Sequence, residues 1–178
     1  MRVRVNIVGL SAGWWACVIG AANEMAWIGL LVVGAHLAIH LRLSGHLTHE
    51  MQLLLTAGGV GFLLDFILVS IGVLVFPTQA VLHTSPAWMV ALWLNFATAM
   101  STSLTYLRGH LLAATLVGGF GGPMAYWGGV QAGAIELALS ELIWVAVEWG
   151  LALPFLSWLS VRLHGRPTED SRIERAIV

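Results

Sequence analysis

The stretch MQLLLTAGGVGFLLDFILVSIGVLVF, residues 51–76, contains a single charged side chain, that of Asp65. A helix that crosses the hydrocarbon layer of a membrane needs about 20 mainly apolar residues, because the layer is about 30 Å thick and each residue rises about 1.5 Å. The stretch therefore predicts a transmembrane helix that is long enough to tilt or bend.

Five further apolar stretches have a comparable character. They cover residues 5–22, 26–43, 86–107, 110–133 and 136–163. The composition agrees, since 58% of the 178 residues are hydrophobic and 10% are charged, whereas about a quarter of the residues in a soluble domain are charged. We expect an all-α polytopic membrane protein, with one domain of six transmembrane helices in residues 1–164 and a short polar tail in residues 165–178.

The positive charges are unevenly distributed among the connections. The chain has eight arginines and no lysine. Arg2 and Arg4 precede the first stretch, Arg42 and Arg108 end or follow the second and fourth, and the other four end or follow the sixth. Because connections rich in Lys and Arg stay in the cytoplasm, both termini and the tail are predicted to be cytoplasmic. Arginines in such places reflect membrane topology, so no nucleic-acid partner is predicted.

Three carboxyl groups lie inside the predicted helices and away from their first residue, where ionisable groups are costly and usually face the interior of the bundle. Asp65 shares a predicted helix face with Gly58, Gly61 and Gly72, so another helix is expected to approach it closely. Glu148 lies near the middle of the last stretch, and Glu141 lies two turns earlier, nearer its outer end. We take all three as candidate ligand-binding residues, with a purely structural role as the alternative.

Two further groups of polar residues have helical spacing. The fourth stretch has a stripe of Asn95, Thr98, Thr102 and Thr105, and the second has His36 and His40 one turn apart. Together with the carboxyls, they are predicted to line one internal site, for which Asn95 and His36 are candidates. The alternative is that they only bond to neighbouring helices or to their own backbone.

The fifth stretch has four glycines and Pro123 close together near its middle. Proline removes a helical hydrogen bond, and glycine lets the backbone approach a ligand or another helix. Gly122 and Pro123 are therefore candidate ligand-binding residues, with close helix packing as the alternative.

No metal or cofactor is predicted. Two histidines four residues apart can share a zinc ion, which makes His36 and His40 the metal candidates, but two ligands do not complete a site. The single cysteine, Cys17, provides neither a disulfide within the chain nor a multi-cysteine metal site. The sequence lacks phosphate-loop, dinucleotide-binding and nucleophile-elbow motifs.

Several short motifs occur in a characteristic order. They are Gly13-Trp14-Trp15-Ala16-Cys17-Val18, Gly20-Ala21-Ala22, Leu63-Leu64-Asp65, Phe76-Pro77, Pro86-Ala87-Trp88, Ala91-Leu92-Trp93, Phe96-Ala97-Thr98 and Gly121-Gly122-Pro123. In this order they resemble the uncharacterised bacterial inner-membrane family known as domain of unknown function 2878, over nearly the whole chain. The resemblance implies a location in the bacterial inner membrane and a role linked to membrane-lipid modification. Membrane lipids, and a lipid-modifying enzyme or another membrane subunit, are the partners it implies.

Three functions are left open by the sequence. The first is an accessory protein for lipid-modifying enzymes, which binds an acyl chain or a partner helix along the fifth helix. The second is a small-molecule carrier, because the six-helix plan and Ala12-x-x-x-Ala16 resemble the substrate-binding subunits of energy-coupling-factor transporters. The third is an intramembrane enzyme that uses Asp65 or Glu148 as acid or base. An enzyme is the least expected, because the sequence supplies neither a nucleophile nor a set of metal ligands.

Overall fold

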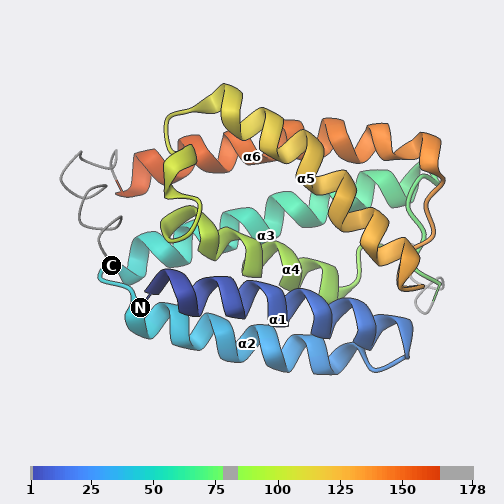
Figure 1. The fold of residues 1–178 in the computed structure, drawn as a ribbon, viewed down its shortest axis with the longest axis horizontal. Helices are drawn as coiled ribbons and strands as arrows, with labels where there is room; N and C mark the ends of the chain where they lie inside the picture. The colour runs from blue at the N-terminus through green and yellow to red at the C-terminus, as the bar shows by residue number, and fades with distance from the viewer. Residues whose placement is uncertain (1, 78–83, 165–178) are drawn as a thin grey trace.

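The computed structural model describes residues 2–77 and 84–164, in which six α-helices form one bundle (Figure 1). They are α1 (Arg2–Ala22), α2 (Ala26–Leu43), α3 (Leu47–Ser70), α4 (Ala87–Ala97), α5 (Leu111–Gln131) and α6 (Leu142–His164). Three short 3-10 helices accompany them, η2 (Thr98–Ser101), η3 (Thr105–Leu107) and η4 (Leu139–Glu141). The predicted all-α class is confirmed, and the predicted tail, residues 165–178, lies outside the described residues.

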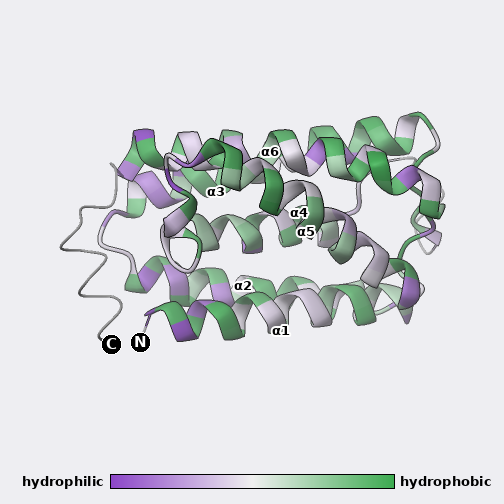
Figure 2. Ribbon diagram, turned by 45° about the horizontal axis from the view of Figure 1, so that its top comes forward, coloured by the Kyte–Doolittle hydropathy of each residue, from purple (hydrophilic) through white to green (hydrophobic). Residues whose placement is uncertain are grey.

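Four of the helices are long and apolar enough to cross a membrane, namely α1, α2, α3, and α6 together with η4. The helix formed by α4 and η2, Ala87–Ser101, is apolar but shorter. Figure 2 shows hydrophobic residues along most of the bundle and the most hydrophilic ones mainly toward its ends. The chain is therefore a membrane protein of α-helical type. Six crossings and cytoplasmic termini stay predictions.

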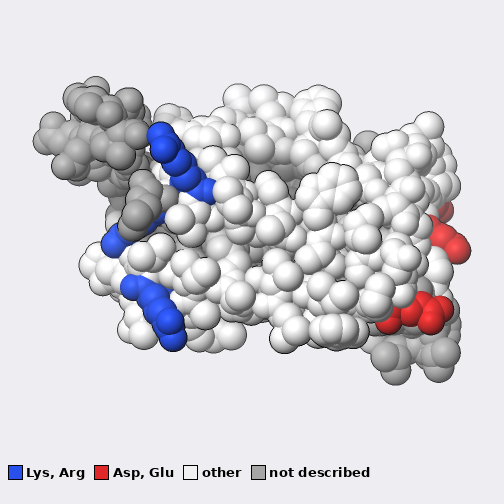
Figure 3. All heavy atoms as spheres, turned by 60° about the horizontal axis from the view of Figure 1, so that its bottom comes forward, with Lys and Arg blue, Asp and Glu red and all other residues white. Residues whose placement is uncertain are grey.

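On the face drawn in Figure 3, the arginines lie toward one end of the bundle and the exposed acidic residues toward the other. We call one end the arginine end, since the described arginines lie there, and the other the acidic end, which carries Glu24, Glu136 and Glu141. The start of α1 and the end of α6 both lie at the arginine end (Figure 1). The described arginines thus lie together, as the sequence predicts, while Arg166, Arg172 and Arg175 fall outside the described residues.

Helices α3 and α5 end at the acidic end with the same turn. Each is followed by a glycine with a positive φ, 76° at Gly72 and 80° at Gly133, which glycine adopts easily because it has no Cβ. The backbone N–H after each glycine bonds to the carbonyl five residues earlier, as in a Schellman motif. This turn ends α3 at Ser70, so the prediction that the third helix covers 51–76 is wrong at that end. The helix also begins earlier than predicted, at Leu47.

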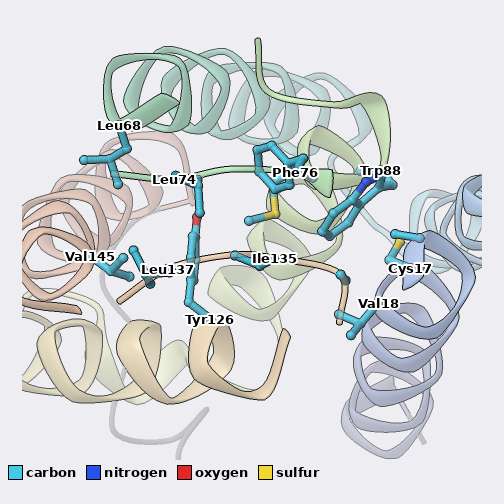
Figure 4. Packing of buried hydrophobic residues seen from close by; sticks show 14 of the residues in the cluster. Cys17, Val18, Leu68, Leu74, Phe76, Trp88, Tyr126, Ile135, Leu137 and Val145 are labelled. Atoms are coloured by element: carbon cyan, nitrogen blue, oxygen red, sulfur yellow. The ribbon is translucent and has the colours of Figure 1, made fainter. Parts of the chain in front are cut away.

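The segments after these two turns pair with each other. The N–H of Val75 donates to the carbonyl of Glu136 at 3.1 Å, and the N–H of Glu136 donates to the carbonyl of Val75 at 2.8 Å. Because residues 132–138 are not helical, α6 begins at Leu142 and not at residue 136 as predicted. Apolar side chains pack around this pair (Figure 4), among them Leu74, Phe76, Trp88, Tyr126, Ile135 and Leu137.

The fourth predicted helix, 86–107, is interrupted. Its α-helical part ends at Ala97, and the chain continues in 3-10 turns. Here the hydroxyl of Thr98 donates to the carbonyl of Asn95, and the hydroxyl of Thr102 donates to the carbonyl of Thr98. Such side-chain bonds compete with the regular helical pattern, which gives a physical reason for the break.

Neighbouring side chains bond to the carbonyl groups of this irregular segment. Ser157 of α6 donates to the carbonyl of Leu107 at 2.6 Å, and the Arg108 guanidinium donates to the carbonyl of Met100 at 2.9 Å. Non-helical backbone at membrane depth is tolerated where protein groups shield it and accept or donate its hydrogen bonds. The segment is therefore an integral part of the bundle.

Helices α5 and α6 pack closely through the glycines of α5. A Cβ at Gly118 would overlap the carbonyl oxygen of Trp149, and a Cβ at Gly122 would overlap the ring of the same tryptophan. α5 continues as one helix through Pro123. Gly118 and Gly122 therefore pack against α6, which agrees with the packing alternative that the sequence left open.

Candidate functional site

Asp65 of α3 is completely buried and accepts hydrogen bonds from three other parts of the chain. The donors are the indole N–H of Trp93 on α4 at 2.8 Å, the hydroxyl of Tyr126 on α5, and the hydroxyl of Ser85 at 3.4 Å. The ring of Trp93 lies against Gly61, so the glycine face of α3 receives another helix as expected. Asp65 thus has a well-defined structural role as a shared acceptor.

Glu148 of α6 is also buried, with 5% of its surface exposed, but its environment differs. Neither of its carboxyl oxygens has a hydrogen-bond partner among the described residues. It is close enough to Asp65 for the two carboxyls to interact electrostatically. A buried carboxyl without a partner is costly when ionised, so Glu148 is the carboxyl whose presence the packing does not explain.

Asn95 of α4 and His36 of α2, both predicted site residues, are hydrogen-bonded to each other. The amide oxygen of Asn95 lies 2.6 Å from Nδ1 of His36, and its amide nitrogen donates to the carbonyl of Leu10 at 3.2 Å. In this orientation His36 Nδ1 carries the hydrogen. The other ring nitrogen of His36, Nε2, is buried and has no partner among the residues that the structure describes.

A cavity of about 350 Å³ lies between α1, α4, α5 and α6. We call it the tryptophan cavity, because its walls include Trp14, Trp15, Trp88, Trp93 and Trp149. Ser11 and Trp15 of α1, which also line it, are exposed, so the cavity reaches the side of the bundle. Its volume and its mainly apolar walls, rich in aromatic residues, are those of a small-molecule or lipid pocket.

A second, more polar cavity of about 840 Å³ lies at the arginine end. We call it the vestibule. Its basic lining residues are Arg2, Arg4, Arg108, His36, His40, His46 and His164. Glu50 is the one acidic residue in the described lining.

Glu50 joins three elements around the vestibule. Its carboxylate lies 3.0 Å from Nε2 of His40 and 3.3 Å from Nε2 of His164, and it accepts a bond from the hydroxyl of Ser101 at 2.9 Å. Glu50 and His164 were not among the candidates from sequence. The short connection between α2 and α3 indicates that Glu50 lies near His40 at the end of α2. The sequence contains no comparable indication that His164 lies near Glu50.

The remaining sequence candidates lie apart from these cavities. Glu141 belongs to η4, where its carboxylate accepts a bond from the backbone N–H of Ala138 at 3.0 Å, next to the start of α6. Gly122 is packed against Trp149, and Pro123 is half-buried on α5. None of the three lines the tryptophan cavity or the vestibule.

The two metal candidates, His36 and His40, have different hydrogen-bond partners. His36 is bonded to Asn95 and His40 to Glu50, with their ring centroids 6.4 Å apart. Within residues 2–77 and 84–164, no group of three or more His, Cys, Asp or Glu side chains is arranged to hold a metal ion.

Comparison with protein families supplies the assignment. The profile of the family "Protein of unknown function (DUF2878)" matches residues 3–155. The chain belongs to this family. The match extends from α1 into α6 and contains the lining of the tryptophan cavity, so the resemblance seen in the sequence is confirmed. The DUF2878 description assigns no activity to any residue. No curated protein and no solved structure matches the chain.

Proposed function

We propose that this DUF2878 protein binds the hydrocarbon chain of a membrane lipid in the tryptophan cavity. It would act in the bacterial inner membrane as an accessory protein for a lipid-modifying enzyme, as its family resemblance implies. The observation that carries the binding proposal is the cavity itself, which is lined by five tryptophans and reaches the side of the bundle. In a membrane protein, the side of the bundle faces lipid chains.

The chemistry of the walls supports a chain-like ligand. Aromatic rings offer large apolar surfaces, and the indole and phenol groups of Trp and Tyr place a polar atom at the edge of such a surface. Trp93 and Trp149 both line the cavity and stack with ring centroids 4.3 Å apart, and Asn95 lies at the polar boundary of the cavity. A lipid has the same two parts, an apolar chain that would contact the aromatic rings and an ester or head group that would lie near Asn95.

Photo-crosslinking tests the proposal. The protein in lipid nanodiscs would be exposed to phosphatidylcholine that carries a diazirine on one acyl chain, and labelled peptides would be mapped by mass spectrometry. We expect labels to concentrate on the lining of α1, α4 and α5. Ala125→Phe fills the cavity from α5 and should reduce this labelling several-fold.

Ala35→Phe is the matched control, because Ala35 is exposed on α2 and does not line the cavity. It should leave the labelling of the cavity unchanged. Labels spread evenly over all exposed helix faces, in the wild type as in Ala125→Phe, would exclude a specific chain site.

A small-molecule carrier is the second candidate, and Glu148 is the observation that favours it. Its buried carboxyl near Asp65, which has no hydrogen-bond partner in the described part of the chain, is the kind of group that carriers use to bind a solute or a proton. Native mass spectrometry of the purified protein, compared with Glu148→Gln, tests this reading. A co-purifying small molecule that is lost only in the variant would favour a carrier, and identical spectra would count against it.

A further inference from the structure

The tryptophan cavity and the vestibule meet at one hydrogen bond. Asn95 lines the first cavity and His36 lines the second, and their side chains are bonded at 2.6 Å. An apolar compartment that reaches the side of the bundle therefore adjoins a polar compartment at its arginine end. Such a pair of compartments matches the two parts of an amphiphilic molecule.

Among the described residues, the lining of the vestibule carries more positive than negative charge. Arg2 and Arg4 line it, whereas its one described acidic residue, Glu50, is already in contact with His40 and His164. The N-terminus of α1 adds the positive end of a helix dipole, because the helix starts at Arg2. Guanidinium groups bind phosphate and carboxylate well, since their N–H groups match pairs of anionic oxygens.

A buried group in the vestibule also lacks a partner. His36 is 5% exposed, and its Nε2 makes no hydrogen bond to any described residue. Buried polar atoms in folded proteins are almost always hydrogen-bonded, so this nitrogen is an exception next to the vestibule.

We infer that the vestibule holds the phosphate-bearing head group of the same anionic lipid whose chain occupies the tryptophan cavity. The inference rests on the proposed function and adds the class of lipid. The guanidinium groups of Arg2 and Arg4 bind the phosphate, and the Asn95–His36 pair lies where the head group joins the chain.

The test compares two diazirine-labelled lipids with the same acyl chains, anionic phosphatidylglycerol and zwitterionic phosphatidylcholine, in nanodiscs that contain the full chain. We expect the wild type to be labelled about tenfold more by phosphatidylglycerol, because arginines near the membrane surface attract anionic lipids. The Arg2→Gln, Arg4→Gln double variant should lose this preference and still be labelled in the tryptophan cavity.

The control variant is Arg42→Gln, Arg162→Gln. It removes the same charge from the same end of the bundle, and both residues are exposed and outside the vestibule lining. It should keep the preference for phosphatidylglycerol. Equal loss in both double variants would mean general surface attraction and would overturn the inference.

Two further outcomes separate the possible failures. If both lipids label the tryptophan cavity to the same extent, the head-group inference alone is overturned. Binding of inorganic phosphate would be followed by ³¹P line broadening. If phosphate binds to the wild type but not to Arg2→Gln, Arg4→Gln, and both lipids label the protein equally, the vestibule binds a free anion and the head-group inference is overturned. An anionic preference without any label in the tryptophan cavity would overturn both the shared-ligand inference and the proposed function.

Discussion

The ring of Trp93 on α4 stacks on the ring of Trp149 on α6, with centroids 4.3 Å apart and planes 11° apart. Each ring also makes a contact with a second helix. The indole N–H of Trp93 donates to Asp65, and the ring of Trp149 rests on Gly122. The wall of the tryptophan cavity is therefore positioned by Asp65 and Gly122, two residues that the sequence suggested as direct ligands.

Asp65→Asn should destabilise the protein while Glu148→Gln should not. Asparagine replaces one of the two acceptor oxygens of Asp65 with an NH2 group, which is itself a donor and cannot accept the bonds of the neighbouring donors. A buried polar group left without a partner costs about 1–3 kcal/mol. Glu148 has no described hydrogen bonds to lose. Thermal unfolding in detergent measures both, and a lower midpoint for Glu148→Gln than for Asp65→Asn would contradict the assigned roles.

Gly122→Ala should destabilise the contact between α5 and α6. Its methyl group would overlap the ring of Trp149, and overpacking of this kind costs about 1–3 kcal/mol. Gly121→Ala is the matched control, because a Cβ there meets nothing within 4 Å. Unfolding followed by tryptophan fluorescence would show the difference, and equal midpoints for the two variants would mean that the helices are less closely packed than described.

Ser157→Ala should loosen the irregular segment after α4. The change removes the bond to the carbonyl of Leu107, whose loss in a buried setting costs about 1 kcal/mol. Hydrogen exchange should become faster in residues 98–110. Ser70→Ala removes a comparable bond, to the carbonyl of Phe66, at an exposed position and should leave this segment unaffected. The same exchange rate in wild type and Ser157→Ala would argue that other bonds hold the segment.

Asn95→Leu tests the boundary between the two cavities. Leucine keeps the approximate size but removes the bonds to His36 and to the carbonyl of Leu10. We expect chain labelling in the tryptophan cavity to persist and the preference for phosphatidylglycerol to fall, because His36 loses its orientation. An unchanged preference would show that the pair does not contribute to recognition of the head group.

The apolar stretches predicted all six helices because hydrophobic length depends only on composition along the chain. The ends of the helices were predicted less well. The Schellman turn at Gly72 is set by a local glycine, which hydropathy does not register. The pairing of Val75 with Glu136 depends on a partner segment about 60 residues away in the chain, which hydropathy does not detect either. Likewise, hydropathy did not reveal that the carbonyls between α4 and α5 find donors on α6.

The sequence predicts only part of the candidate site, because it does not show which distant segments come together. Asn95 and His36 were singled out as polar residues at membrane depth, and the structure brings them together. The tryptophans of the cavity wall look like ordinary apolar residues in sequence, so their convergence from α1, α4 and α6 was not predicted. The contact of Glu50 with His164 requires knowledge of which helix ends meet.

The bridge between Val75 and Glu136 has a mechanical consequence. It lies between the first three helices and the last three, and it provides their backbone hydrogen bonds to each other within the described residues. At the opposite end, these halves are held by side chains such as Glu50 and His164. The loss of such side-chain contacts would therefore loosen the bundle at the vestibule and leave the backbone pairing at the acidic end in place.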